Sequence, residues 1–187
     1  MEHFYKNLGE NWFNYHELYS EIVSIASNGS HFVEVGSWKG MSSAYMAVEI
    51  INSGKKIKFD CVDIWEYMDI QQDIPQGKYE NLYETFLKNI SPVKDIISPI
   101  KSISWEAASL YIDGSLDFIF IDAAHDYESV KKDLSAWYPK LKSTGIIAGH
   151  DYLTSKNGVK RAVDEFFEEV EQNGPCWVYK KNYSHDS

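Results

Sequence analysis

The chain has 187 residues, a net charge of −10 and a pI near 5.0, and 44% of its residues are hydrophobic. This length is typical of one domain, here 1–187, with enough apolar residues to cover both faces of a sheet. An acidic chain without a basic stripe is a poor match for a protein that binds nucleic acid through its phosphates. We therefore expect no nucleic-acid partner.

Cysteine content and hydropathy indicate a reducing, aqueous compartment. The two cysteines, Cys61 and Cys176, give neither a disulfide framework nor the spacing of a metal site. The sequence also has no leader pattern and no apolar run of membrane-spanning length. We expect a cytoplasmic protein without a membrane partner.

Helical and strand-like segments alternate along the chain. The expected order is helix 14–26, strand 31–35, a helix from 43 to 53, strand 56–63, a long loop 65–78, helix 79–90, strand 93–100, a short helix 104–111, strand 116–122, a helix from 126 to 139, strand 146–149, helix 159–170 and strand 176–179. Residues 116–122 are almost entirely apolar after Asp117, which is typical of a central parallel strand. The alternation predicts an α/β fold, a three-layer α/β/α sandwich around a doubly wound, mostly parallel sheet.

The most informative stretch is the turn after the first strand. The run 31–35 ends in Gly36, and Gly40 precedes the next helix, whose first N–H groups are open to an anionic group. The spacing is G-x-x-x-G, unlike the G-x-G-x-x-G of dinucleotide-binding proteins. Glu34, two residues before Gly36, suits a ligand with an ammonium group and would repel a pyrophosphate. A strand–glycine–helix turn without a ligand gives the same pattern, so this stretch alone leaves both interpretations open.

Polar residues also follow the other predicted strands. Ligands of such sheets bind beyond the carboxyl ends of the strands. The residues found there are Glu34 with Gly36, Asp63, Ser102 or Ser104, Asp122 with His125, and His150 with Asp151. Each has an ordinary explanation, such as a helix cap at Asp63 or Ser104. Together, polar groups at five strand ends favour a binding site.

Physical chemistry suggests roles for these residues. Asp63, at the end of the second strand, is placed to accept both hydroxyls of a ribose. Asp122 and Asp151 end adjacent buried strands, and two close carboxylates are best explained by a shared divalent cation. His150 is either a third ligand or turned away. His125 lies three residues after Asp122, and an imidazole there would take a proton from a substrate hydroxyl.

These motifs resemble class I S-adenosylmethionine-dependent methyltransferases of the small-molecule O-methyltransferase branch. Residues 33–42, with the pattern E-x-G-x-x-x-G-x-S, are similar to the first motif of catechol O-methyltransferases. Residues 116–127, together with 149–152, are similar to O-methyltransferases that modify sugars and macrolide sugars. The resemblance covers about residues 30–170.

The resemblance implies S-adenosylmethionine as the cofactor. It gives as cofactor-binding residues Glu34, Gly36, Ser37, Trp38, Gly40, Ser42, Asp63, Ile64, Ser104, Trp105 and Asp122. The metal-dependent relatives bind Mg²⁺ through residues that match Asp122, His150 and Asp151, so these are the expected ligands of Mg²⁺ or Mn²⁺. The residue that matches His125 is the general base in those relatives.

The chain departs from the family pattern at two places. His150 stands where the metal-dependent relatives carry an acid, which puts the identity and the presence of the metal in question. After the last predicted helix there is room for one strand, where the superfamily usually has two. We therefore expect the seventh, antiparallel strand to be absent or formed differently.

The expected reaction is an in-line methyl transfer from a sulfonium to the hydroxyl of a small molecule, with a sugar as one option; a homo-oligomer is compatible with the sequence. The acceptor pocket is expected from the N-terminal part, 1–28, and the loop 65–78. Its aromatic candidates are Tyr5, Trp12, Phe13 and Tyr15, which would equally serve to cover a sheet edge.

Two alternatives stay open. A Rossmann-type NAD-binding oxidoreductase is disfavoured by Glu34 and by the missing third glycine. A non-catalytic protein that binds S-adenosylmethionine would have a decayed metal site, signalled by His150.

Overall fold

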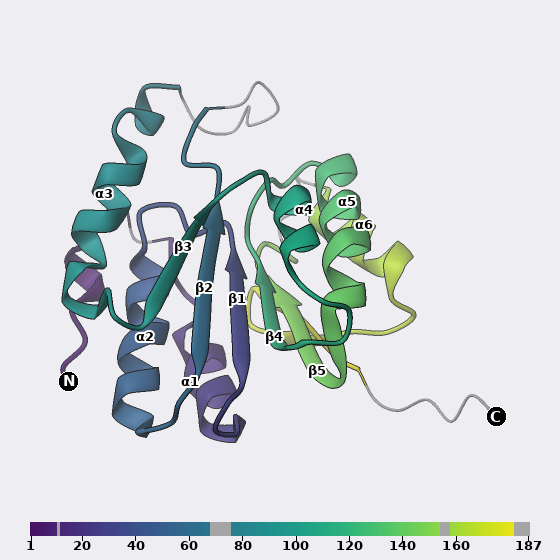
Figure 1. Cartoon of the computed structure of the whole chain (residues 1–187). Helices are drawn as coiled ribbons and strands as arrows, with labels where there is room; N and C mark the ends of the chain where they lie inside the picture. The colour runs from purple at the N-terminus through teal and green to yellow at the C-terminus, as the bar shows by residue number, and fades with distance from the viewer. Residues whose placement is uncertain (11, 68–75, 154–157, 182–187) are drawn as a thin grey trace.

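A computed structural model describes residues 1–10, 12–67, 76–153 and 158–181. Within these residues one sheet of seven strands is flanked by helices on both faces (Figure 1). The strands are β1 (His31–Val35), β2 (Lys58–Asp63), β3 (Ile97–Lys101), β4 (Leu116–Ile121), β5 (Leu141–Gly149), β6 (Glu171–Asn173) and β7 (Cys176–Lys180). The helices are α1 (His16–Ile25), α2 (Met41–Ser53), α3 (Leu82–Asn89), α4 (Ser104–Ala107), α5 (Tyr127–Trp137) and α6 (Val159–Phe166).

The strand order confirms the predicted doubly wound sheet. It is β3-β2-β1-β4-β5-β7-β6, and the pairs from β3 through β5 are parallel. The order reverses at β1, so the two halves of the sheet extend from it in opposite directions. The carboxyl ends of these parallel strands meet at the upper edge of the sheet in Figure 1. A crevice at such a reversal is where ligands bind in open α/β sheets.

Two apolar layers hold the sandwich together. Helices α1, α2 and α3 cover one face of the sheet, and α4, α5 and α6 cover the other (Figure 1). Side chains alternate along β1 as the pleat requires: Phe32 packs in the first layer, and Val33 and Val35 pack in the second. β4 has buried side chains on both faces, as predicted for a central parallel strand.

The expectation for the C-terminus was wrong. A seventh strand is present: β7 pairs antiparallel with β5, and the edge strand β6 pairs antiparallel with β7. Gly174 has a φ of 57° and allows a tight turn between the paired residues Asn173 and Cys176. β6 consists of three polar residues. An exposed edge strand needs no apolar alternation, so the hydropathy pattern does not predict it.

Other boundaries differ by a few residues. Helix α6 ends at Phe166 rather than at residue 170, since the chain must leave the helix before the β6–β7 hairpin. β5 begins at Leu141 and runs through Thr144 and Gly145, which the sequence had suggested as a turn. Its pairing with β4 contains a register shift, and a side chain at Gly145 would meet Leu141 Cδ1 at 2.7 Å. Glycine is needed there for close packing, not for a turn.

The N-terminal segment, residues 1–10 and 12–15, crosses from the lower end of α2 to the carboxyl edge of the sheet. Its contacts, in order, are Met1 with Asn52, His3 with Glu49, the Leu8 carbonyl with Asn89, and Glu10 with Lys39 and Lys78. The two lysines lower the pKa of Glu10 to about 2 through hydrogen bonds to its carboxylate. Among the described residues, no helix is long and apolar enough to cross a membrane.

Candidate functional site

Backbone hydrogen bonds continue past the ends of the parallel strands and bring the predicted residues into one row. Gly36 N donates to Val62 O at 2.8 Å, and Asp122 N donates to Val35 O at 2.7 Å. The next residue in the row, His150, donates from its N to Ile121 O at 3.2 Å. The ends of β2, β1, β4 and β5 are thereby fixed side by side.

Both motif glycines are required by the protein's own packing. Gly36 has a φ of 92°, and a Cβ there would lie 2.0 Å from the backbone oxygen of Asp122. Gly40 has a φ of 81°, and a Cβ there would lie 2.9 Å from Ile90 Cγ2 and 3.0 Å from Phe86 Cδ2. The sequence suggested that these glycines admit a ligand, but each already has a structural reason within the fold.

Glu34 lies in the interior, between the sheet and helices α1 and α2. Its carboxylate accepts hydrogen bonds from Tyr19 Oη at 2.9 Å and from Ser43 Oγ, and Cys61 Sγ lies 3.7 Å away. Burial raises the pKa of Glu34, although the neighbouring hydroxyls oppose the shift. Its exposed fraction is 1%, so in this conformation it can act on a ligand only through the residues that it holds, such as Ser43 near the start of α2.

Asp63 binds two backbone N–H groups at the end of β2. Oδ2 accepts from Trp38 N at 2.8 Å, and Oδ1 accepts from Trp65 N at 2.7 Å. Trp65 Nε1 in turn donates to Trp38 O at 2.8 Å, which closes a ring of hydrogen bonds. Trp38 and Trp65 have φ values of 46° and 47°, a conformation that non-glycine residues adopt only when something holds them there. Asp63 is therefore the residue that shapes this part of the edge.

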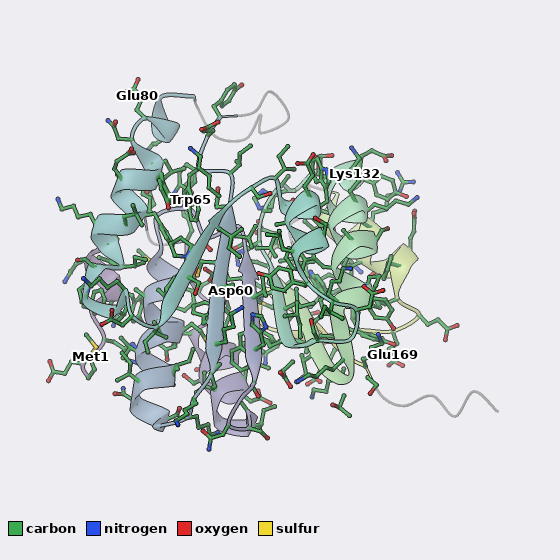
Figure 2. All side chains as sticks on the ribbon, viewed as in Figure 1. Met1, Asp60, Trp65, Glu80, Lys132 and Glu169 are labelled. Atoms are coloured by element: carbon green, nitrogen blue, oxygen red, sulfur yellow. The ribbon has the colours of Figure 1, made fainter. Side chains whose placement is uncertain are left out.

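Burial raises the pKa of Asp63, against the backbone hydrogen bonds that it accepts. Its side chain and that of Ile64 are half-buried at this edge. Figure 2 labels Trp65 at this edge, beside α3, where its ring packs on Tyr83 and Phe86. Ser37 and Ser42, the predicted hydroxyl residues of the glycine turn, are buried below the edge.

Ser104 and Trp105 follow β3 and begin the short helix α4. Ser104 Oγ donates to Asp133 Oδ1 at 2.5 Å, and Lys132 Nζ lies 4.9 Å from the centre of the Trp105 ring. Asp133, on α5, is fully buried, and its Oδ2 has no hydrogen-bond partner among the described residues. Burial raises the pKa of Asp133 to about 7, and the hydrogen bond from Ser104 offsets only part of that effect.

Two carboxylates and two imidazoles converge beyond β4 and β5; we call them the Asp–His cluster (Asp122, His125, His150 and Asp151). His125 Nε2 lies 3.1 Å from Asp151 Oδ2 and 3.7 Å from Asp122 Oδ1. His150 Nδ1 lies 3.6 Å from Asp122 Oδ1 and 3.6 Å from Asp151 Oδ1. Asp151 adopts a φ of 60°, which turns its side chain back over the sheet edge.

The ionised forms of Asp122 and His150 stabilise each other within this cluster. Burial opposes ionisation of Asp122, but hydrogen bonds and charge from His125 and His150 hold the pKa of Asp122 well below its usual range. Burial likewise opposes protonation of His150, but Asp122 and then Asp151 raise the pKa of His150 above its usual value. Asp122 is therefore an anion that the surrounding imidazoles compensate.

The cluster fits a divalent cation. The residues whose ligand atoms all lie within 4.8 Å of one another are Asp122, His125 and Asp151, so His125 takes the place that the sequence predicted for His150. His150 Nδ1 lies 3.6 Å from one oxygen of each of the two carboxylates. Two ligands that share a cation at about 2.0–2.2 Å are themselves roughly 3–3.5 Å apart, close to the spacing seen here. A set that mixes imidazole with carboxylate suits Mn²⁺, Fe²⁺ or Zn²⁺ better than Mg²⁺, which prefers oxygen throughout.

Only part of the predicted acceptor pocket lies within the residues that the structure describes. Phe13 is buried against Tyr5 and Tyr45, so it covers the helices, whereas Trp12 is 50% exposed and stacks on Trp38. Tyr15 points to the Asp–His cluster. Most of the loop 65–78 lies outside the described residues.

Several residues that matter here had no signal in the sequence. They are Asn14, Tyr19, Ser43 and Asp133. Each acts through a contact with a residue distant in the chain, which periodicity and motif spacing do not report. Trp65, which also matters here, lies two residues after a strand-end aspartate, where a short Asp-x-x turn pattern would have indicated it.

Comparisons with known proteins identify the family and the fold of the chain. A family model described as a methyltransferase domain matches residues 33–152. The O-methyltransferase NovP is 18% identical, with a TM-score of 0.66 over 89% of this chain and 79% of that one. An SAM-dependent O-methyltransferase from Thermotoga maritima is 13% identical, with a TM-score of 0.65 over 97% of this chain and 71% of that one.

A third structure is CalS11, described as TDP-rhamnose 3′-O-methyltransferase, an enzyme of calicheamicin biosynthesis. It is 14% identical, with a TM-score of 0.59 over 88% of this chain and 76% of that one. No curated protein sequence matches the chain. At these identities the structural likeness shows the fold alone.

The buried carboxyl of Asp133 should make stability depend on pH. The folded chain keeps this proton up to about pH 7, whereas the unfolded chain releases it near pH 4, so stability falls as the pH rises between these values. Asp133→Asn cannot ionise. Between pH 4 and pH 8 the free energy of unfolding of the unsubstituted chain should therefore fall, relative to that of Asp133→Asn, by up to about 4 kcal/mol. Urea denaturation of both proteins at each pH measures this difference. Asp113→Asn, at an exposed carboxylate, is the control; parallel pH curves for Asp133→Asn and the unsubstituted chain would contradict the assignment.

Proposed function

Because the chain belongs to the methyltransferase domain family and has the class I methyltransferase fold, we propose that it is an S-adenosylmethionine-dependent O-methyltransferase. Its acceptor is the hydroxyl of a small molecule, with a sugar as the first class to test, and a divalent cation assists the transfer. The observation that carries the proposal is the Asp–His cluster, which adjoins the turn and the β2 end where the cofactor would lie. NovP and CalS11 are described as O-methyltransferases, and their likeness to this chain supports the same chemistry here.

The cofactor would bind along the ends of β1, β2 and β3. The first turn of α2 begins at Gly40 without a side-chain cap, so its N–H groups are available to the carboxylate of the methionine part. Asp63, already oriented by two backbone N–H groups, would accept the ribose hydroxyls. Half-buried Ile64, Ser104 and Trp105 would contact the adenine.

Methyl transfer needs little from the protein beyond positioning and removal of one proton. The acceptor oxygen attacks the methyl carbon in line with sulfur, a carbon–oxygen bond forms, the carbon–sulfur bond breaks, and its electron pair stays on the sulfur of S-adenosylhomocysteine. The hydroxyl proton goes to His125 Nε2 and from there to water. A divalent cation held by Asp122, Asp151 and His150 would lower the pKa of the hydroxyl and orient its oxygen.

The surroundings of the two imidazoles differ, and on that basis we assign His150 as a cation ligand and His125 as the base. His150 is 11% exposed and turns Nδ1 into the cluster, as a ligand would. His125 is 26% exposed and follows β4 in a loop, so it can reach both an acceptor and water.

The decisive experiment is a transfer assay with labelled S-adenosylmethionine and a panel of sugar, phenol and polyketide hydroxyls. Transfer should disappear in excess EDTA and return on addition of Mn²⁺, because the cation lowers the pKa of the acceptor. Asp151→Asn should not be restored by Mn²⁺, while Asp113→Asn should behave like the unsubstituted protein. Full activity in EDTA would remove the metal from the proposal. Tight binding of S-adenosylhomocysteine without transfer to any acceptor would support a non-catalytic binding protein instead.

Cofactor binding should depend on Asp63. Asp63→Ala removes the acceptor of the ribose hydroxyls and releases the Trp38 and Trp65 backbones, so S-adenosylhomocysteine should bind more weakly by about 1–3 kcal/mol. Calorimetry on protein shown to be folded by circular dichroism measures this change. Asp113→Ala serves as the control, and unchanged affinity in Asp63→Ala would exclude Asp63 from the cofactor site.

His125 should affect turnover and not cofactor binding. His125→Ala removes the proton acceptor, so kcat should fall by about 10²–10⁴-fold while the affinity for S-adenosylmethionine stays the same. The pH–rate profile of kcat should also lose its acidic limb. His16→Ala, at the start of α1, is the matched control. A variant that unfolds more easily but keeps normal kcat in its folded fraction would assign His125 a structural role.

A further inference from the structure

Two consecutive residues of the N-terminal segment contact the Asp–His cluster from the side of α1. Asn14 Oδ1 lies 2.9 Å from His150 Nε2, and Tyr15 Oη donates to Asp122 Oδ2 at 3.0 Å. Neither residue comes from the strands that carry the cluster. Both lie just before α1 (His16–Ile25), where the N-terminal segment reaches the sheet edge.

The Asn14 contact determines which nitrogen of His150 carries the proton. An amide oxygen only accepts, so His150 Nε2 must donate. In the neutral ring the lone pair is then on Nδ1, which faces Asp122 Oδ1 and Asp151 Oδ1 at 3.6 Å each. A lone pair between two carboxylate oxygens is favourable only with a positive charge among them, either a proton or a cation.

Tyr15 holds the carboxylate of Asp122 in one orientation by a hydrogen bond to Oδ2. Its ring is buried, with its centre 4.6 Å from that of Phe120 and 4.9 Å from that of His150. Because Oδ2 of Asp122 is occupied by this donor, Oδ1 is the oxygen left facing His125 and His150.

We propose that Asn14 and Tyr15 are positioning residues of the cation site, which select Nδ1 of His150 and Oδ1 of Asp122 as its donor atoms. The inference rests on the proposed function, since it takes a cation to be the occupant of the cluster. It adds that the site is incomplete without the N-terminal segment. Partners of this kind fix the tautomer and orientation of a ligating histidine and commonly change metal affinity by 10–100-fold.

The test is direct metal binding, measured by calorimetry with Mn²⁺ and with Zn²⁺ in the absence of cofactor and acceptor. Asn14→Leu and Tyr15→Phe should each weaken binding by about 10–100-fold. Asn52→Leu makes the same change at the other end of the N-terminal segment, where Asn52 bonds Met1, and should bind metal normally. Tyr45→Phe, which removes a hydroxyl bonded to Ser20 in the same aromatic cluster, is the control for Tyr15→Phe.

A second measurement does not depend on affinity. The ¹⁵N shifts of the neutral His150 ring in the metal-free protein should show a protonated Nε2 and an unprotonated Nδ1, and Asn14→Leu should turn this into a mixture of tautomers. Asn14→Asp keeps an acceptor oxygen and should restore the single tautomer.

The outcomes separate the two proposals. Normal metal affinity together with an unchanged tautomer in Asn14→Leu would overturn the positioning role and leave the proposed function intact. If the unsubstituted protein binds neither metal, while S-adenosylhomocysteine still binds, the metal-assisted reaction and the positioning role fall together. Normal affinity in Tyr15→Phe would limit the role to Asn14.

Discussion

The site depends on the way in which four parallel strands end. Backbone hydrogen bonds run one residue past the ladders, so that Gly36, Asp122 and His150 are tied to Val62, Val35 and Ile121 in turn. The approach is so close that a single methyl group at Gly36 would collide with the backbone of Asp122. Close backbone packing of this kind fixes the positions of the residues that follow the strands.

Three of the carboxylates near this edge form hydrogen bonds with other residues of the protein. Glu34 stabilises the start of α2 from the interior, Asp63 holds two strained tryptophan backbones, and Asp133 fixes Ser104. These carboxylates therefore set the shape of the edge, whereas the carboxylates and imidazoles of the Asp–His cluster lie close to one another. The separation makes chemical sense, because a methyl donor is already activated and its acceptor is the reactant that requires polar assistance.

The sequence predicted the fold well because alternating periods and strand-end polar residues are local signals. β4 illustrates this: its apolar run and its terminal Asp122 both follow from residues 116–122. The edge strand β6 was not predicted, because its side chains are exposed or half-buried and show no apolar pattern. The part of the site that the sequence missed is the part made by long-range contact. Nothing near Asn14 indicates that it meets His150, and the interior position of Glu34 depends on Tyr19 and Ser43 arriving from other helices.

The pairing of Asn14 with His150 also has a consequence for biosynthesis. The two residues are 136 positions apart, so at 5–20 residues per second Asn14 leaves the ribosome roughly 7–27 s before its partner. Asp122 is made before His150, and Asp151 directly after it, so the cluster is incomplete until residue 151 has been made. Under the proposed function, the complete set of cation ligands therefore forms only after the strands that carry it have been made.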